Sequence, residues 1–469
     1  MNVRVPIIGP TYQSSSLPVA NQVTRNFLIE ADQNSDTVAA LVPFPGLKLF
    51  AATPKMFSRG LGRFNDELYS ISEDILYRIN AVGDHFEIGV ISGSNRCSIE
   101  ESTTNLVIAT GEGKPYAYNG TTLTQGTDID LPEASTVSYI RNRVAYDGVN
   151  GDIAFADLSI PLSVNSANVT SVDTNPDSTL AVQAFRDQLF VFSEHSITPY
   201  YNSGSGNPPF LVIPNAFTGV GLAAIHSIAV NSRSMFFLGS DLMVYRINGL
   251  QPEPIGNSSI GAAISSYPAG SISGAYGVCF NLRNQYLYLL TFPGQASWLY
   301  TDGIGWTNLA YGVEGEPHLI ADYQYCYGRH LVSDRLSGNI YELDFDTFTD
   351  NGNVIERRRD TRKITGKDFG FPGKEIYMES LEVVVETGTG IISGQGVNPK
   401  LMMTYSDDGG RTWAPEQWAD IGAMGSFTYN QNPKFYDLGS FYERQFKFRV
   451  TDPVKTVFIS ANADIQVGA

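Results

Sequence analysis

The feature that most constrains the fold is a pair of short apolar strands that recurs along the first three quarters of the chain. In each unit a polar turn precedes one strand, and a second strand ending in an aromatic side chain follows, as in NDELYSIS and ILYRIN. The corresponding positions are separated by 38, 38, 45, 46, 51 and 45 residues: Leu68, Leu106, Val144, Leu189, Met235, Tyr286 and Leu331. This spacing leaves room for four strands in each unit and is typical of β-propeller blades.

The repeat predicts an all-β chain built around a propeller. One four-stranded unit cannot bury its apolar faces alone, whereas units that stack in a ring cover one another. Seven units can be recognised, and because one of them could be an excursion, six blades are the alternative. The related peptides LYRIN (76–80) and VYRIN (244–248) support duplicated hairpins. An irregular β-protein with chance spacing is the other interpretation.

The pattern changes after residue 350, which predicts three parts. Residues 51–350 are expected to form the propeller, with protruding loops in the stretches rich in Pro, Gly, Ser and Asn. Residues 351–469 are expected to form a β-sandwich-like domain, because strands such as RQFKFRV alternate apolar and polar side chains. The first 50 residues lie outside the repeat, and we expect them to pack on the C-terminal domain.

Charge and cysteine content exclude several classes of protein. The net charge of −17 is opposite to that of a protein that coats DNA, which needs excess Lys and Arg to displace counterions from phosphates. The three scattered cysteines, Cys97, Cys279 and Cys326, are odd in number and indicate buried free thiols. No apolar run reaches the length of about 18 residues that spans a membrane. The composition favours the cytoplasm or a particle assembled there.

A short motif near the C-terminus, YSDDGGRTW (405–413), has the pattern of the Asp-box turn known from sialidase propellers. Ser406 and Asp408 can offer side-chain oxygens to the backbone of a tight turn, and Gly410 permits positive φ. Thr412 belongs to the same turn, and Trp413 after it is expected to fold back over the hairpin and cover it with an apolar ring. We predict a structural turn, since the motif supplies no acid, base or nucleophile.

A sialidase-like or glycan-binding propeller remains the alternative function. Arginines occur on successive units, but most of them precede a strand at the same repeat position, which is more typical of a structural role: Arg63, Arg78, Arg141, Arg143, Arg186, Arg233, Arg246 and Arg283. The sequence has none of the motifs GxGxxG after a strand, GxxxxGK[ST], HExxH or GxSxG. The five histidines show no metal-ligand spacing. We therefore predict no catalytic residue, no cofactor and no metal.

One strongly basic run follows the propeller and is a candidate partner-binding site: Arg357, Arg358, Arg359, Arg362 and Lys363. It could contact DNA phosphates or an acidic partner chain, or it could be the solvated face of a linker strand. A protein partner ranks above DNA because the planar fork of arginine suits interfaces.

Both ends of the chain resemble the packaged-DNA stabilisation proteins of short-tailed bacteriophages, also called tail nozzle or hub proteins. The resemblance rests on NQVTRNFLIEADQNSDTVAALVPFPGLKLF near the N-terminus and on SDDGGRTW with a downstream RVTDPV near the C-terminus. It implies a non-enzymatic virion component, assembled in the host cytoplasm and without membrane insertion of its own. The family's contact residues are not defined by a motif that can be mapped onto this sequence.

The resemblance further implies a homo-oligomeric ring, generally six-fold, below the portal and its adaptor protein. Such a ring continues the DNA channel, retains the packaged genome and docks tail fibres or spikes and the plug protein. Phage DNA would pass through its lumen without sequence-specific binding, since an acidic wall does not hold phosphates. As a hypothesis, the segments 162–178 or 203–219 form the constriction that retains DNA.

Overall fold

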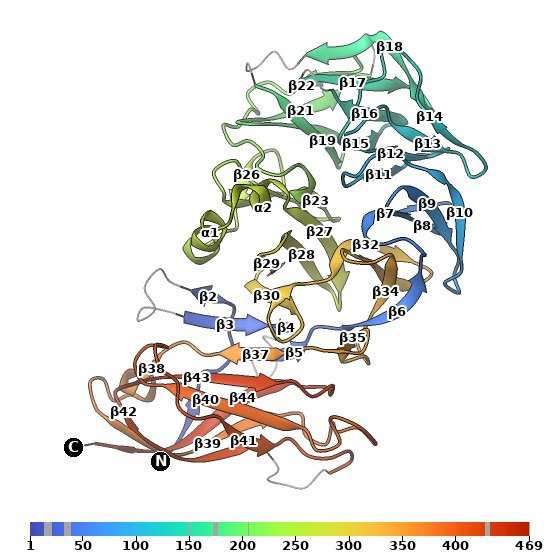
Figure 1. Cartoon of the computed structure of the whole chain (residues 1–469). Helices are drawn as coiled ribbons and strands as arrows, with labels where there is room; N and C mark the ends of the chain where they lie inside the picture. The colour runs from blue at the N-terminus through green and yellow to red at the C-terminus, as the bar shows by residue number, and fades with distance from the viewer. Residues whose placement is uncertain are drawn as a thin grey trace.

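The computed structural model describes residues 1–13, 21–31, 39–148, 151–171, 177–204, 206–426 and 432–468. It contains a ring of β-sheets set on a β-sandwich, and both marked chain ends lie at the sandwich (Figure 1). The predicted β-propeller with a C-terminal β-sandwich is confirmed. Within the described residues, no helix is long and apolar enough to cross a membrane.

Five sheets of the ring are each made of four consecutive antiparallel strands, and a sixth set of four such strands belongs to a larger sheet. The first three sheets contain β7 (Ser58–Phe64), β8 (Glu67–Ser72), β9 (Ile75–Ile79) and β10 (His85–Val90); β11 (Ser98–Glu101), β12 (Leu106–Ala109), β13 (Tyr116–Tyr118) and β14 (Leu123–Gln125); and β15 (Val137–Ile140), β16 (Arg143–Asp147), β17 (Asp152–Asp157) and β18 (Ile160–Ser171). The next three contain β19 (Thr179–Phe185), β20 (Gln188–Ser193), β21 (Ile197–Asn202) and β22 (Phe210–Val212); β23 (Ala229–Val230), β24 (Met235–Leu238), β25 (Val244–Ile247) and β26 (Pro252–Pro254); and β27 (Tyr276–Leu282), β28 (Gln285–Phe292), β29 (Ala296–Thr301) and β30 (Gly305–Tyr311).

A seventh sheet closes the ring with a strand from the other end of the sequence. It contains β32 (Ile320–Cys326), β33 (Arg329–Asp334), β34 (Asn339–Asp344) and then β6 (Gly46–Ala52), followed by the short strands β35 (Thr349–Asp350) and β36 (Asn353–Val354). Strand β32 also contacts β7 of the first sheet. Because β6 pairs with β34, the first and last parts of the propeller hold each other in place.

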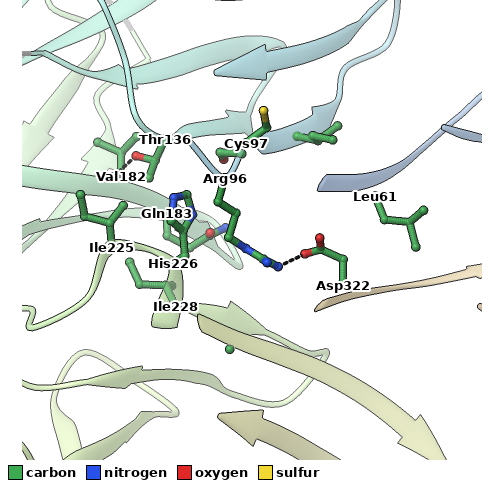
Figure 2. Close-up of a pocket in the computed structure, with 13 residues that line it drawn as sticks. Leu61, Arg96, Cys97, Thr136, Val182, Gln183, Ile225, His226, Ile228 and Asp322 are labelled. Carbon is green, nitrogen blue, oxygen red and sulfur yellow. Dashed lines mark hydrogen bonds and ion pairs between the residues drawn. The ribbon is translucent and has the colours of Figure 1, made fainter. Parts of the chain in front are cut away.

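The recurring sequence positions all lie on the second strand of their sheets, from Leu68 on β8 to Leu331 on β33. Apolar side chains of neighbouring sheets pack between them, for example Phe192 and Phe237, whose ring centroids are 5.3 Å apart. Short helices interrupt the pattern near the fifth sheet: η1 (Ile225–Ser227), α1 (Ser258–Ser265) and α2 (Ala269–Ser273). The side chain of Arg96, which precedes β11, reaches Asp322 on β32 (Figure 2).

The sandwich is built from both ends of the chain. One sheet contains β4 (Phe27–Ala31), β5 (Ala39–Pro43), β44 (Phe458–Val467), β39 (Ile376–Val385) and β42 (Lys434–Phe441), with β1 (Asn2–Val5) paired to β44. The facing sheet contains β3 (Asn21–Arg25), β37 (Arg357–Asp360), β43 (Glu443–Val450), β40 (Lys400–Ser406) and β41 (Gln417–Asp420), with β2 (Tyr12–Gln13) beside β3 and β38 (Ile364–Thr365) beside β43. A 3-10 helix, η2 (Gly366–Phe369), follows β38.

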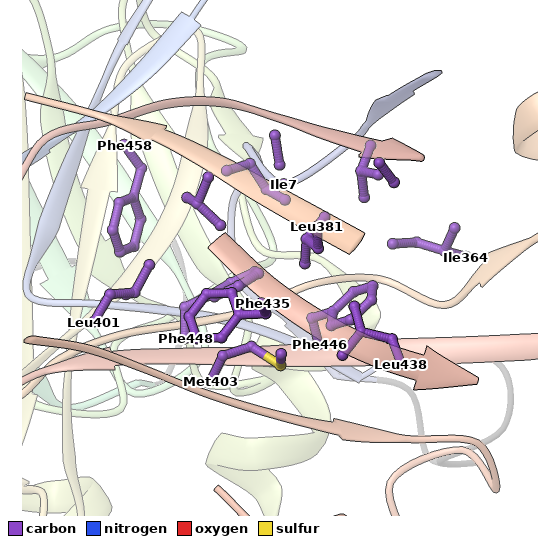
Figure 3. Packing of buried hydrophobic residues seen from close by; sticks show 14 of the residues in the cluster. Ile7, Ile364, Leu381, Leu401, Met403, Phe435, Leu438, Phe446, Phe448 and Phe458 are labelled. Atoms are coloured by element: carbon purple, nitrogen blue, oxygen red, sulfur yellow. The ribbon is translucent and has the colours of Figure 1, made fainter. Parts of the chain in front are cut away.

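The core between these sheets explains the alternation seen in RQFKFRV. Phe446, Phe448 and Val450 all face inward, and they pack with Phe458, Phe435 and other apolar side chains (Figure 3). Val5, Phe27 and Leu41 from the N-terminal strands belong to the same core.

The domain boundaries expected at residues 50 and 350 fall inside β6 and at the end of β35. Both strands pair within the seventh sheet of the propeller.

Propeller and sandwich share one continuous sheet. Strand β3 pairs antiparallel with β37 of the sandwich and, through Arg25 and Asn308, parallel with β30 of the sixth propeller sheet. Another short strand, β31 (Glu316–Pro317), pairs with β30. The N-terminal segment is therefore the physical link between the two parts.

Candidate functional site

The Asp-box motif forms a tightly capped turn between β40 and β41. Asp408 accepts hydrogen bonds from the backbone N–H groups of Arg411 and Thr412 and, at 2.6 Å, from the Thr412 hydroxyl. The Ser406 hydroxyl donates to Asp408 at 2.7 Å and accepts from the N–H of Gly410, which has a φ of +90°. These bonds, led by that of the Thr412 hydroxyl, lower the pKa of Asp408.

The rest of the motif packs on the neighbouring strand. The Lys447 ammonium lies 3.8 Å from the ring centroid of Trp413, so this tryptophan covers β43 through a cation–π contact. Arg444 is buried, and its guanidinium makes two hydrogen bonds of 2.7 Å to Asp407 of the same turn. The side chains of Ser406, Asp407, Asp408 and Thr412 thus have partners inside the turn or on β43, an arrangement that holds a hairpin.

The arginines of the repeat mostly hold adjacent turns and strands. Arg78 contacts Glu67 at 3.2 Å, Arg141 contacts Asp187 at 2.9 Å, and Arg246 contacts both Glu253 and Asp302 at 2.9 Å. Arg63 pairs with Asp66 in its own turn. These arginines are distributed around the ring, with carboxylates beside them, and do not gather at one place.

The structure divides the basic run into buried and exposed members. Arg357 and Arg359 lie on β37 with their side chains fully buried. Arg358 binds Asp360 through two hydrogen bonds, of 2.8 and 2.5 Å. The remaining two are partly exposed and paired, Arg362 with Asp368 at 2.6 Å and Lys363 with Glu443 at 2.7 Å. Most of the run therefore contributes to the inside of the fold, and Arg362 keeps the largest exposed surface.

Arg359 fastens the N-terminal segment to the sandwich. Its guanidinium donates to the carbonyl oxygens of Ile7 and Gly9 at 2.6 and 2.9 Å and to the Thr24 hydroxyl at 2.7 Å. A further bond of 3.2 Å reaches the side-chain oxygen of Gln22. Burial lowers the pKa of Arg359 to about 10, which leaves it charged at neutral pH.

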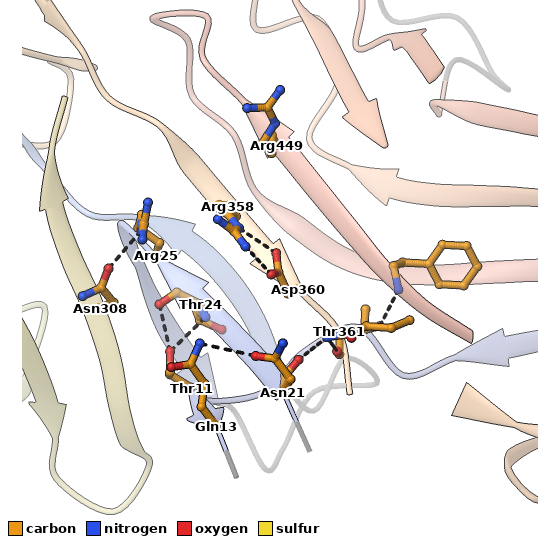
Figure 4. Close-up of polar contacts among 12 residues, drawn as sticks. Thr11, Gln13, Asn21, Thr24, Arg25, Asn308, Arg358, Asp360, Thr361 and Arg449 are labelled. Atoms are coloured by element: carbon orange, nitrogen blue, oxygen red, sulfur yellow. Dashed lines mark hydrogen bonds and ion pairs between the residues drawn. The ribbon is translucent and has the colours of Figure 1, made fainter. Parts of the chain in front are cut away.

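The junction between propeller and sandwich is a polar network on β3 and its neighbours (Figure 4). Arg25 donates to the Asn308 side chain at 2.9 Å and to Glu356 at 3.0 Å. Glu356, whose side chain is 5% exposed, also contacts Arg449 at 3.4 Å. One carboxylate thus joins β3, β37 and β43.

Asn26 completes this junction in a left-handed conformation. Its backbone φ is +59°. Its side-chain amide donates to the carbonyl oxygens of Ala310 and Glu356, both at 2.9 Å, and accepts from the N–H of Ala310 at 2.8 Å. Sequence reasoning did not single out Arg25, Asn26 or Glu356. Arg25 and Asn26 lie in the N-terminal stretch and Glu356 lies just before the basic run, and these places were their only signal in the sequence. Local patterns could not report more, because the partners are about 280 to 330 residues away.

Two family models match the chain, and both are described by the same phage protein. A family described as bacteriophage P22 Gp10, beta-propeller, matches residues 3–348, and one described as bacteriophage P22 Gp10, beta-sandwich, matches residues 369–466. No curated protein sequence matches the chain.

Solved structures resemble the chain only at low identity. The WD40 domain of Neurospora crassa Pan2 is 6% identical, with 64% of this chain and 94% of that chain covered and a TM-score of 0.42. BamB from Moraxella catarrhalis is 10% identical, with 73% and 96% covered and a TM-score of 0.38. PorZ of Porphyromonas gingivalis is 14% identical at a TM-score of 0.40, and the match covers 66% of this chain but only 39% of that protein. Likenesses at this level carry no functional argument.

Proposed function

The chain belongs to the bacteriophage P22 Gp10 family of packaged-DNA stabilisation proteins and is a structural phage tail protein, and we propose that six copies of it form a ring below the portal and its adaptor. The ring would continue the DNA channel, retain the packaged genome and dock tail fibres or spikes. The match of both family profiles to nearly the whole chain is the observation that carries this proposal. We propose that the role is mechanical and involves no catalysis.

The charge of the chain supports a DNA channel. A net charge of −17 on each copy would give a negative lumen, to which phosphates cannot bind, so DNA slides past the wall. The state of the basic run fits this role, because Arg357 and Arg359 are buried and Arg358 is bonded to Asp360. Retention of DNA would then be steric.

The segments 162–178 and 203–219 are our candidates for that steric barrier. The first lies largely on β18, and the second includes β22. Residues 172–176 of the first and residue 205 of the second fall outside the described residues. Both belong to sheets far from the sandwich in Figure 1. Shortening either segment should release genomes from otherwise complete particles, and genomes that stay packaged in both variants would contradict the assignment.

The outward face of the sandwich is our candidate for the surface that meets the adaptor. Tyr377 on β39 and Tyr436 on β42 are 42% and 58% exposed there, and neighbouring Tyr442 is 65% exposed. Large exposed aromatic side chains are enriched at protein interfaces. Because β3 pairs with strands of both parts of the chain, deleting the sandwich would damage the propeller, and surface substitutions are the cleaner test.

Two experiments test the proposal. Electron microscopy of the purified chain, alone and with its tail partners, should show rings with a central channel; a chain that stays monomeric with every partner would contradict it. In particles, Tyr377→Lys with Tyr436→Lys should abolish incorporation while thermal unfolding stays normal. Tyr325→Lys, an equally exposed tyrosine on propeller strand β32, is the matched control and should be incorporated.

A further inference from the structure

Two neighbouring, partly open chambers with different walls lie near the first strands of the propeller sheets. Their volumes are 160 Å³ and 480 Å³, and both are bordered by Arg96, Ile225 and His226. Asp322 lines the smaller chamber, where its carboxylate holds the Arg96 guanidinium (Figure 2). The larger chamber is bordered instead by Arg335 and Tyr276, together with several hydroxyl side chains.

The lining of the larger chamber contains two arginines, each with a carboxylate beside it: Asp322 pairs with Arg96, and Glu316 lies 3.8 Å from Arg335. Among the residues that line it, Arg96 and Arg335 carry charge, and none is an aspartate or a glutamate. The chain as a whole carries −17. Hydroxyl groups fill much of the remaining wall: Ser58, Thr110, Ser135, Ser273 and Tyr276. Two guanidinium groups beside hydroxyl donors are the combination that oxyanions bind.

Both arginines keep donors that no described residue uses. Arg96 binds the Ala321 carbonyl and Asp322 through Nη2 alone, which leaves Nε and Nη1 without a described partner. Arg335 donates from Nε to the His318 carbonyl at 3.2 Å and from Nη2 to the Pro317 carbonyl at 3.0 Å, which leaves Nη1. These contacts fix the two side chains in position, so the remaining donors are preorganised.

Tyr276 supplies an independent sign of a ligand. It is 7% exposed, and its buried hydroxyl makes no hydrogen bond of normal geometry with a described residue, although the Thr291 hydroxyl is close enough to interact with it. The nearby Thr291 hydroxyl is bonded to Ser297 at 2.9 Å. The Arg96 guanidinium stacks on the Tyr276 ring, 4.4 Å from its centroid. A buried hydroxyl without a partner costs free energy, and such a group in a native protein commonly faces a ligand or water.

We propose that the larger chamber binds a small oxyanion, held between Arg96, Arg335 and the hydroxyl of Tyr276. The shared chemistry is a phosphate, sulfate or carboxylate group. Asp322 acts here as a positioning residue, because it orients Arg96 from the side of the smaller chamber. This binding site is separate from the proposed ring and channel, and neither depends on the other.

Isothermal titration calorimetry of the full-length chain tests the site, at constant ionic strength. Inorganic phosphate, sulfate, a nucleoside monophosphate and acetate serve as separate ligands, and the anion that binds identifies the source of the oxyanion. We expect one site per chain. Tyr276→Phe should weaken binding by about tenfold, because one hydrogen bond to a charged group is lost. Arg335→Gln should weaken it by at least about tenfold.

Matched variants keep this test decisive. Tyr377→Phe and Arg362→Gln change the same residue types on the sandwich and should bind like the wild type. Tyr276→Phe removes a hydroxyl that makes no hydrogen bond of normal geometry within the described part of the chain, so we expect its thermal unfolding to stay unchanged. This variant alone tests the site if Arg335→Gln misfolds. Absence of binding by all four anions at millimolar concentration, or equal binding by wild type, Tyr276→Phe and Arg335→Gln, would overturn the proposal.

Discussion

Arg357 and Asp350 are both fully buried where the propeller meets the sandwich, yet neither side chain forms a hydrogen bond within the described residues. Burial raises the pKa of Asp350 to about 7, although the charge of Arg357 opposes the rise. Burial also lowers the pKa of Arg357 to about 10, against the attraction of Asp350. For both groups the cost of leaving water exceeds the gain from their mutual attraction.

Replacing Arg357 by methionine should therefore stabilise the protein. The substitution removes a buried charge and keeps an apolar chain of similar length beside Phe348, and we expect a gain of about 1 kcal/mol or more. Urea unfolding measures the change. Arg359→Met is the matched control from the same strand and should destabilise, since Arg359 has partners for its donors. Equal losses of unfolding free energy in both variants would show that Arg357 also has a bonding partner in solution.

Stability should depend on pH through Asp350. Its folded pKa of about 7 lies above the unfolded value of about 4, so the unfolded chain loses its proton first and stability falls as pH rises between these values. Asp350→Asn stays neutral. We expect it to match the wild type near about pH 4 and to be the more stable protein near about pH 8. Buried Glu100 and Asp147, with pKa values of about 7 and about 6, act in the same direction and remain in both proteins. A difference in the free energy of unfolding between the two proteins that stays constant across this pH range would contradict the raised pKa of Asp350.

Arg359→Lys should loosen the N-terminal segment. Lysine has one ammonium and cannot reach Ile7, Gly9 and Gln22 together, so buried acceptors lose their donors. We expect a loss of about 3 kcal/mol and faster hydrogen exchange at residues 3–8. Arg362→Lys, at the exposed end of the run, should change stability by less than about 0.5 kcal/mol. Wild-type exchange in Arg359→Lys would contradict the role assigned to Arg359.

Local patterns made most of the propeller predictable from the sequence. The turn before each second strand and the apolar run after it depend on neighbouring residues, and for this reason Leu68 and Leu331 were placed on equivalent strands. The Asp-box turn is local in the same sense, since Ser406, Asp408 and Thr412 bond within seven residues.

Contacts between distant segments could not be predicted in this way. The pairing of β6 with β34 and the bridge from β3 to β30 join residues nearly 300 positions apart, and no periodicity reports such pairs. The basic run illustrates the same limit. Charge alone suggested a surface, whereas Arg357 and Arg359 occupy alternate positions of one strand and so point to its same, buried side.

Asp408→Ala should destabilise the turn that follows β40. The N–H groups of Arg411 and Thr412 lose their acceptor, so their hydrogen exchange should accelerate and thermal stability should fall. Because the pKa of Asp408 is lowered, its contribution is present above about pH 4 and disappears in acid. Asp420→Ala, which loses only an exposed ion pair with Lys400, is the control. Unchanged exchange in Asp408→Ala would mean that the glycines alone hold the turn.

Asn26→Ala should uncouple the propeller from the sandwich. The change removes three hydrogen bonds, to Ala310 and Glu356, inside a buried junction, and it places alanine at a φ of +59°. We expect a loss of about 3 kcal/mol or more, with separate unfolding of the two parts in place of one transition.

Asn26→Gly separates the two causes of that loss. Glycine tolerates positive φ, so it should recover about 1 kcal/mol relative to alanine while the hydrogen bonds stay broken. Differential scanning calorimetry follows the number of transitions, and hydrogen exchange at Ala310 reports its lost acceptor. If Asn26→Gly regained wild-type stability, backbone conformation alone would explain Asn26; if both variants kept a single wild-type transition, the continuous sheet through β3 would couple the parts without it.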